Sequence, residues 1–267
     1  MKKILFSILA LAWMCGAGWA ATSAETKLLC HFNGSNGATS YTSDDANARV
    51  ATFYSSAQLS TAQKKFGTAS LLLTAENSDY ISFPDSDDWA FGTGDFTIDA
   101  WVYIASLWDG ESTTLVSQVI DSDNWWALYV YKYGASTWFY IRGYSGGVSI
   151  IDWSPSATIS TGAFFHWALV RSGNTLYMFQ NGTLLDTFDA TGVSFPNFAS
   201  PLYIGIGAWG GPWGPLDGYV DELRITNTAE WTNNFTPPTS EYSFATTSPY
   251  SHVFNSGFNE GIDQGFN

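Results

Sequence analysis

The chain has 267 residues, with 10 basic and 24 acidic side chains and a formal net charge of −14. This excess of negative charge disfavours binding to nucleic acids and to anionic membranes, which both require basic surfaces. The length is sufficient for one large β-sandwich with a full hydrophobic core.

The N-terminus predicts export. Two lysines precede an apolar run from Ile4 to Met14, and Gly18 and Ala20 occupy positions −3 and −1 of a cleavage site. We therefore expect residues 1–20 to be a signal peptide and the mature protein to be secreted, either extracellular or in the periplasm or at the cell surface. The apolar run is too short for a membrane span, so we expect no integral span after processing.

A second candidate cleavage site follows Ala24. Cleavage at either position leaves Cys30 as the one cysteine, which excludes a disulfide framework in the mature chain. Cys30 alternates with His31 in the first predicted strand, and we expect its side chain to point into the core.

Strand signals recur along the chain, whereas helical periodicity is almost absent. Clusters of Gly, Asn, Asp, Ser and Pro separate the strands, and Ser172–Asn174 and Asn181–Gly182 predict tight hairpins. This pattern predicts an all-β fold, an antiparallel two-sheet sandwich over residues 25–242. Residues 243–267 lack alternation and are rich in Ser, Gly, Asn and Phe, so we expect a low-complexity, flexible tail. The predicted strands are Lys27–Phe32, Ala69–Thr74, Tyr80–Phe83, Phe96–Ile104, Thr114–Val119, Trp125–Tyr131, Thr137–Tyr140, Phe164–Arg171, Thr175–Gln180, Thr183–Phe188, Leu202–Ile206 and Gly218–Thr226.

Five motifs carry a family resemblance: Leu28–Gly34, Lys65–Ser70, Asp79–Pro84 followed by Phe91–Trp101, Gly218–Ile225 and Asn234–Pro238. In this order they resemble the laminin G-like branch of the concanavalin A-like lectin/glucanase superfamily. The resemblance covers roughly residues 28 to 242. It implies a jelly roll of two curved antiparallel sheets, in a family of secreted and cell-surface proteins whose ligands are often carbohydrates or proteins.

The acidic residues do not form the pair that glycoside hydrolysis requires. Retaining enzymes need two carboxyl groups about 5 Å apart, and hydrolases of this superfamily supply them as two glutamates about four residues apart on one strand. No two glutamates of the mature chain have that spacing, and Asp217, Asp221 and Glu222 form the best remaining group. His166 lies in an apolar strand and is interpreted as a hydrogen-bonded core residue. We therefore predict no catalytic residues.

Calcium is the one cofactor that the resemblance implies, in a structural role. Related domains often hold one ion where the turn after the first strand meets the Asp-Glu strand, and the matching positions here are Asn33 and Asp221. Calcium prefers several hard oxygen ligands, and an asparagine at the first position weakens the site by one charge. The alternative interpretation is that Asp221 caps a loop or pairs with a base such as Arg224.

Tryptophan provides the ligand-binding hypothesis, because the chain contains 13 of them. Trp209 and Trp213 flank a Gly-Gly-Pro loop between two strands, and exposed indoles on a stiff loop can stack on sugar rings. Trp125 and Trp126 are further candidates in the middle of the chain, as are Trp108, Trp138 and Trp153. The alternative is that these loops bury their own rings.

These observations favour a secreted, non-catalytic binding module, with carbohydrate as the first ligand class. The alternative is a protein-binding adhesion or structural component of the cell surface. A polysaccharide-active enzyme is the third hypothesis. The expected partner is accordingly a glycan or a cell-surface protein.

Overall fold

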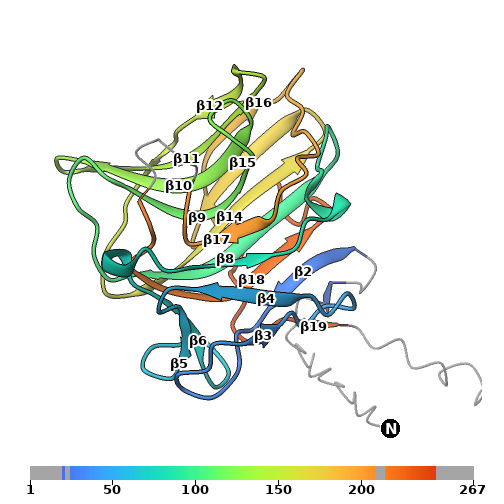
Figure 1. Ribbon diagram of the computed structural model, residues 1–267. Coiled ribbons are helices and arrows are strands. Elements are labelled where there is room, and N and C mark those ends of the chain that lie inside the picture. The colour runs from blue at the N-terminus through green and yellow to red at the C-terminus, as the bar shows by residue number, and fades with distance from the viewer. Residues whose placement is uncertain (1–19, 22–24, 208–213, 245–267) are drawn as a thin grey trace, which may run out of the picture.

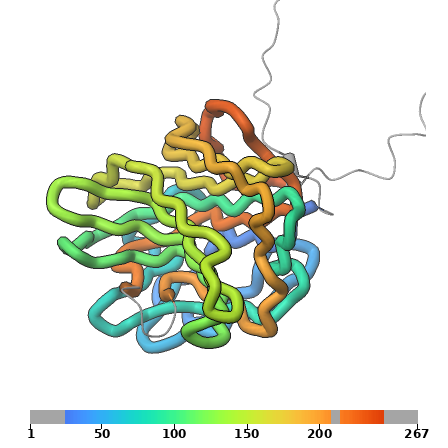
Figure 2. The backbone as a smooth tube through the Cα atoms, turned by 90° about the horizontal axis from the view of Figure 1, so that it is seen from above, coloured from blue at the N-terminus to red at the C-terminus, as the bar shows by residue number. Residues whose placement is uncertain are grey.

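The computed structural model describes residues 20–21, 25–207 and 214–244. Two antiparallel β-sheets pack face to face as successive layers (Figures 1 and 2). This confirms the predicted all-β sandwich. The predicted signal peptide and most of the predicted tail lie outside the described residues and stay predictions. Within the described part of the chain, no helix is long and apolar enough to cross a membrane.

The first sheet has nine strands. Its order is β12 (Val148–Trp153), β11 (Ser136–Ser145), β10 (Trp125–Tyr133), β9 (Ser112–Val119), β17 (Leu202–Ile204), β7 (Tyr80–Phe83), β4 (Val50–Tyr54) and β3 (Tyr41–Thr42), with β13 (Ser156–Ala157) paired to β11.

The second sheet has eight strands. Its order is β16 (Thr183–Asp189), β15 (Thr175–Gln180), β14 (Phe164–Ser172), β8 (Phe96–Ile104), β18 (Gly218–Thr226), β6 (Ser70–Leu73) and β5 (Gln58–Ser60), with β2 (Thr26–Cys30) paired to β18. A separate parallel pair joins β1 (Ala20–Ala21) to β19 (Ser243–Phe244), and two short 3-10 turns span Ala75–Asn77 and Asp87–Trp89.

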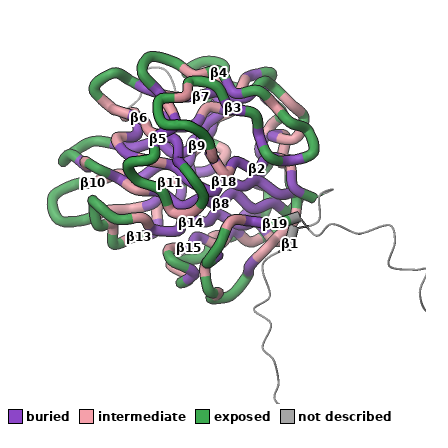
Figure 3. Tube along the Cα trace, turned by 90° about the horizontal axis from the view of Figure 1, so that it is seen from below, coloured by how far each residue is buried: buried purple, intermediate pink, exposed green. Residues whose placement is uncertain are grey.

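Alternation along the strands directs one side chain in two into the space between the sheets. The rings of Phe139 from β11 and Trp167 from β14 stack across that space, with centroids 4.2 Å apart, and Cys30 is fully buried there as expected. Figure 3 shows burial concentrated along β8, β14 and β18, with exposed residues mainly in the turns. Removal of this apolar surface from water is the main stabilising contribution to the sandwich.

Four predicted strands have the observed bounds: β7, β8, β15 and β18. Strands β4 and β12 were not predicted. In β4 both end residues, Val50 and Tyr54, are exposed, so the strand lacks a sustained apolar alternation. Strand β12 follows the Gly146-Gly147 turn and alternates only in its second half.

A buried ion pair lies on the outer surface of the eight-stranded sheet. Asp99 of β8 accepts a hydrogen bond from Arg224 Nε of β18 at 3.0 Å, and its second oxygen lies 3.2 Å from Nε2 of His166 on β14. The hydroxyl of Tyr242 donates to the same carboxylate. Burial alone would raise the pKa of Asp99, but the Arg224 charge and the His166 contact outweigh it and hold the pKa below its usual value.

The segment after β18 covers this ion pair. The Arg224 guanidinium lies between the rings of Trp231 and Tyr242, 5.3 and 4.0 Å from their centroids. Trp231 stacks on Phe235 with centroids 3.8 Å apart, and both rings pack on the outward side chains of β14 and β15. The central part of this outer surface is therefore closed by the protein itself.

We expect Asp99→Ala to lower the free energy of unfolding by about 3–5 kcal/mol, because the substitution removes the buried carboxylate that pairs with Arg224 and leaves only half-buried Glu230, 3.4 Å from Nη1, as its partner. The matched control is Asp152→Ala, which removes a carboxylate that pairs with Arg142 where both side chains are partly exposed. It should cost about 1 kcal/mol or less. Urea unfolding at neutral pH measures both, and equal losses would contradict this role for the buried pair.

Candidate functional site

The outer surface of the nine-stranded sheet carries a ladder of aromatic pairs along the β10–β11 hairpin. Cross-strand pairing places Trp125 opposite Tyr144, Tyr129 opposite Tyr140 and Tyr131 opposite Trp138. The ring centroids within these pairs lie 5.2, 4.9 and 6.2 Å apart. The alternate residues of β10, such as Trp126 and Leu128, point into the core, so the two-residue period of the strand brings the aromatic rings together on one surface.

The rings differ in how much of their surface is open. Tyr131, Trp138, Tyr140 and Tyr144 are half-buried, whereas Trp125 and Tyr129 are buried beneath their neighbours. Burial raises the pKa of Tyr129, so its hydroxyl is neutral at physiological pH. Four half-open rings therefore rest on a packed aromatic base.

A pocket adjoins one end of this ladder. It has a volume of about 760 Å³ and is lined by Tyr80, Tyr203, Val119, Ile120 and their neighbours Asp121, Ser122, Ile206 and Gly207. Tyr80 stacks on Tyr54 at 4.2 Å and contacts Tyr203 at 6.0 Å, edge to face. Val119 lines the pocket and also pairs with Trp125 of the ladder, so pocket and ladder share one surface.

We call this surface the aromatic face. Its residues are Tyr54, Tyr80, Val119, Ile120, Trp125, Tyr129, Tyr131, Trp138, Tyr140, Tyr144 and Tyr203.

Two turns hold the pocket end of the aromatic face in place. Gly146 N donates to Asn124 Oδ1 at 2.9 Å, and Gly147 N donates to the Asp123 carbonyl at 3.0 Å. Asp121 closes the same turn by accepting from Asp123 N and Asn124 Nδ2, both at 2.9 Å. These hydrogen bonds join the β9–β10 turn to the β11–β12 turn, so the end of the ladder is preorganised.

The tryptophans predicted to bind ligand have different positions. Trp126 is fully buried and donates from Nε1 to Gln118 Oε1 at 3.1 Å. This ring is therefore part of the core and is not open to a ligand. Trp125 lies on the aromatic face but is only 6% exposed, and it supports Tyr144 rather than offering an open ring. Trp209 and Trp213 lie outside the described residues, and their role stays a prediction.

The predicted calcium residues Asn33 and Asp221 flank one loop, residues 65–68. Asp221 Oδ2 accepts from the backbone N–H groups of Lys65 and Phe66 at 2.6 and 3.1 Å, and its Oδ1 accepts from Glu222 N at 2.9 Å. Asn33 Oδ1 accepts from Thr68 N at 2.5 Å. Because N–H donors already occupy these oxygens, the pair as placed does not fit calcium, and Asp221 caps the loop.

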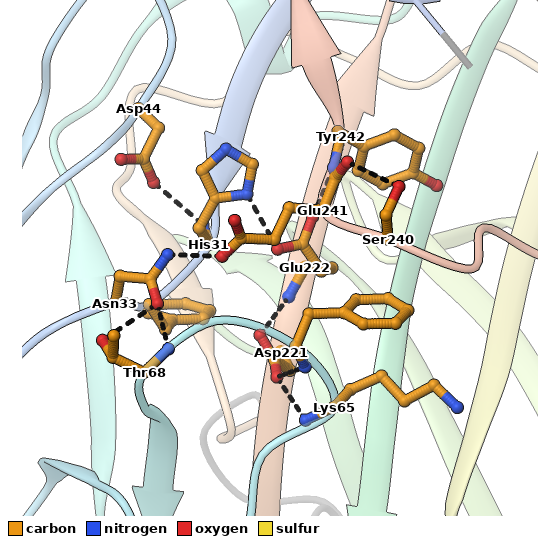
Figure 4. A network of polar contacts seen from close by, with 12 residues as sticks. His31, Asn33, Asp44, Lys65, Thr68, Asp221, Glu222, Ser240, Glu241 and Tyr242 are labelled. Atoms are coloured by element: carbon orange, nitrogen blue, oxygen red, sulfur yellow. Dashed lines mark hydrogen bonds and ion pairs between the residues drawn. The ribbon is translucent and has the colours of Figure 1, made fainter. Parts of the chain in front are cut away.

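A second group of possible ligands lies beside this loop (Figure 4). Ligand atoms of His31, Glu222 and Glu241 lie within 4.8 Å of one another. A bulge in β18 between Asp221 and Arg224, where Glu222 has a φ of 50°, turns neighbouring side chains to different partners.

The three side chains are already paired within the protein. His31 Nδ1 contacts Glu222 Oε1 at 2.8 Å, Glu222 Oε2 accepts from Tyr242 N at 3.0 Å, and Glu241 Oε1 accepts from Asn33 Nδ2 at 2.5 Å. Calcium takes oxygen ligands, so a set that includes an imidazole also fits it poorly. The calcium site stays a prediction.

A family model described as the concanavalin A-like lectin/glucanases superfamily, of the laminin G type, matches residues 75–230. The chain belongs to this superfamily. No curated protein sequence matches it.

Solved structures share the superfamily fold at low sequence identity. Domain 4 of AbnA, a GH43 extracellular arabinanase from Geobacillus stearothermophilus, is 19% identical with a TM-score of 0.57, over 77% of this chain and 94% of that one. The binding domain of Paraclostridial Mosquitocidal Protein 1 is 15% identical with a TM-score of 0.58, over 78% of this chain and 50% of that one.

A botulinum neurotoxin type C structure is 10% identical with a TM-score of 0.55, over 78% of this chain and 49% of that one. The chain thus spans about half the length of the toxin domains that it matches. At these identities the likeness shows the fold alone.

Sequence reasoning named Trp125 and Trp138 of the aromatic face but missed its tyrosines, and it missed the His31–Glu222–Glu241 group. Aromatic residues at every second position from Tyr129 to Tyr133 were a usable signal for the β10 half of the ladder. The group of three had no local signal, because its members come from the end of β2, from β18 and from the segment after β18.

The raised pKa of Asp221 predicts in which direction its contribution to stability changes with pH. Burial raises its pKa from 3.8 to about 7, although the hydrogen bonds from Lys65 and Phe66 oppose the shift. Between these two pH values the unfolded chain has lost the proton and the folded chain retains it, so Asp221 contributes less stability as pH rises from 4 to 7. The difference in unfolding free energy between wild type and Asp221→Asn should therefore decline on the order of 3 kcal/mol across that range.

Urea unfolding of both proteins at several pH values, in the presence of a chelator, measures this difference. A difference that is constant with pH would show that Asp221 stays ionised in the folded state. Excess Ca²⁺ then tests the ion: we expect unchanged melting temperatures, as a loop cap requires. A rise of several degrees in wild type that Asp221→Asn abolishes would instead support the calcium interpretation.

Proposed function

We propose that this protein is an exported, non-catalytic module that binds carbohydrate through the aromatic face. The aromatic ladder of β10 and β11 carries the proposal. Aromatic rings offer flat apolar surfaces to the C–H groups of a sugar, while tyrosine hydroxyls and the tryptophan N–H can bond its hydroxyl groups. The half-buried rings are held by cross-strand packing, so little conformational entropy is lost when a ligand binds.

The shape of the ladder favours an extended glycan. From the Trp125–Tyr144 pair to the Tyr131–Trp138 pair, β10 advances six residues, which is about 20 Å at the rise of a β-strand. A surface of that length can contact several consecutive sugar units of one linear chain.

The charge distribution favours a neutral glycan. Arg142 is the cation within the ladder, and Asp152 already pairs with it, Nε to Oδ2 at 3.1 Å. With a net charge of −14, the protein repels acidic polysaccharides at long range. We therefore place uncharged chains ahead of uronic-acid or sulfated chains.

Two structural relatives agree with a binding role. The structure of the arabinanase domain is a complex with arabinotriose, and the type C neurotoxin is described as depending on interaction with two ganglioside molecules for cell entry. Both proteins share this sandwich fold over the matched part, which is about half of the neurotoxin chain. They support the class of the proposal and do not identify the sugar.

A glycan array is the direct test. We expect the mature protein to bind neutral linear glycans, and Tyr131→Ala with Tyr140→Ala to weaken that binding about tenfold or more, which corresponds to roughly 1.4 kcal/mol. Tyr177→Ala is the matched control, because Tyr177 is a half-buried tyrosine on the other sheet. It should leave binding unchanged.

Several outcomes would redirect the proposal. Binding that survives the Tyr131 and Tyr140 substitutions but is abolished by Trp209→Ala with Trp213→Ala would move the site to residues 208–213. Release of reducing ends from a bound polysaccharide would favour an enzyme. An array without any reproducible binding would favour the protein-binding alternative.

A further inference from the structure

One exposed tryptophan has no role in the sandwich or on the aromatic face. Of the tryptophans in the described ranges, Trp108 alone is mostly open to solvent, at 52%, whereas the others are buried or, for Trp138, half-buried. Trp108 lies in the connection between β8 and β9. Tyr133, at the tip of the β10–β11 hairpin, is 66% exposed. Two large rings are thus left open where the fold does not require them.

Hydrogen bonds join the two chain segments that carry these residues. Gly110 N donates to the Lys132 carbonyl at 2.9 Å, and Lys132 N donates to the Glu111 carbonyl at 3.2 Å. Gly134 N donates to Asp109 Oδ1 at 2.5 Å. The β8–β9 connection is therefore paired with the hairpin tip, so Trp108 and Tyr133 are carried by adjacent, ordered segments.

A pocket of about 700 Å³ opens beside these segments. Leu107, Lys132 and Gly134 line it, and these are the immediate chain neighbours of Trp108 and Tyr133. Most of the remaining lining is hydroxylated, contributed by the hairpin tip and by the segment through β13 to residue 161. The hydroxylated lining residues are Ser136, Thr137, Ser156, Thr158, Ser160 and Thr161.

The chemistry of the lining indicates the ligand. Serine and threonine hydroxyls both donate and accept hydrogen bonds, and Ser156, Thr158, Ser160 and Thr161 are exposed and can rotate toward a ligand. Lys132 is the one charged residue of the lining, and its Nζ donates to the Leu107 carbonyl at 3.1 Å, which leaves two of its three N–H groups for other partners. Such a lining suits a small, uncharged molecule that is itself rich in hydroxyl groups.

We propose that this pocket is a second saccharide site, which binds one or two sugar units of a neutral glycan beside Trp108, whose chain neighbour Leu107 lines the pocket. The volume lies within the range of small-molecule sites. The site is separate from the aromatic face, because Lys132 and Thr137 belong to the opposite surface of the hairpin from Tyr131 and Trp138. Tyr133 alternates with Lys132 and therefore lies on the side of Tyr131. The site therefore does not rest on the function proposed above, and two sites would let one molecule hold two glycan chains or two parts of one chain.

The test uses the full mature chain labelled with 5-fluorotryptophan and fluorine NMR. A separate sample with Trp108→Phe identifies the Trp108 signal by its loss. The chain carries Tyr131→Ala and Tyr140→Ala, so that binding at the aromatic face does not contribute. The probes are glucose, galactose, mannose, xylose, arabinose, cellobiose and lactose, each titrated into the millimolar range. We expect at least one of them to change the fluorine chemical shift of Trp108 saturably. The chemical shift of the buried Trp89 should not change.

A matched variant locates the contact. Ser160→Ala with Thr161→Val removes two exposed hydroxyl groups of the lining and leaves the sandwich core intact, and we expect it to raise the apparent Kd at least threefold. A Trp108 signal that no probe shifts would overturn the proposal. A saturable shift with the same Kd in the Ser160 and Thr161 variant would also overturn it, because the sugar would then lie outside the pocket.

Discussion

The ion pair between Asp99 and Arg224 is the constraint on which the arrangement of this protein depends. A carboxylate without solvent must be paired, and Asp99 is satisfied only when β8, β14, β18 and the segment that ends at Tyr242 are all in place. Breaking the pair would leave a charge buried between aromatic rings. The pair therefore ties the last part of the sandwich to its centre and makes the position of the chain after β18 part of the fold.

This constraint makes the two outer surfaces different. On the eight-stranded sheet, Trp231 and Phe235 pack on the outward residues Ala168, Val170 and Phe179 of β14 and β15 and cover that part of the surface. On the nine-stranded sheet, the outward aromatics of β10 and β11 pack on one another, and Tyr131, Trp138, Tyr140 and Tyr144 remain half-buried. Rigid, half-buried tyrosine and tryptophan side chains supply contact area at a low entropic cost, which is why we propose the binding role for that sheet.

The sequence predicted the sandwich well, because a two-residue alternation is a local property. It gave the bounds of β8 and β18, where apolar residues continue for a full strand, and it missed β4, whose end residues are exposed. It identified Asp221 as important but could not separate a metal ligand from a loop cap, since that depends on which N–H groups face the carboxylate. Trp125 and Trp126 are neighbours in sequence, yet they point to opposite surfaces of the sheet, and only the strand register assigns each to its side.

Hydrogen–deuterium exchange of the protein, alone and with the glycan that binds best, tests the central claim most directly. The account predicts slower exchange on glycan binding in the peptides that span β10, β11 and the β9–β10 turn. The peptides of β14 and β15 should not change, because the segment after β18 already covers them. Protection confined to β14 and β15, with β10 and β11 unchanged, would contradict the assignment of binding to the aromatic face.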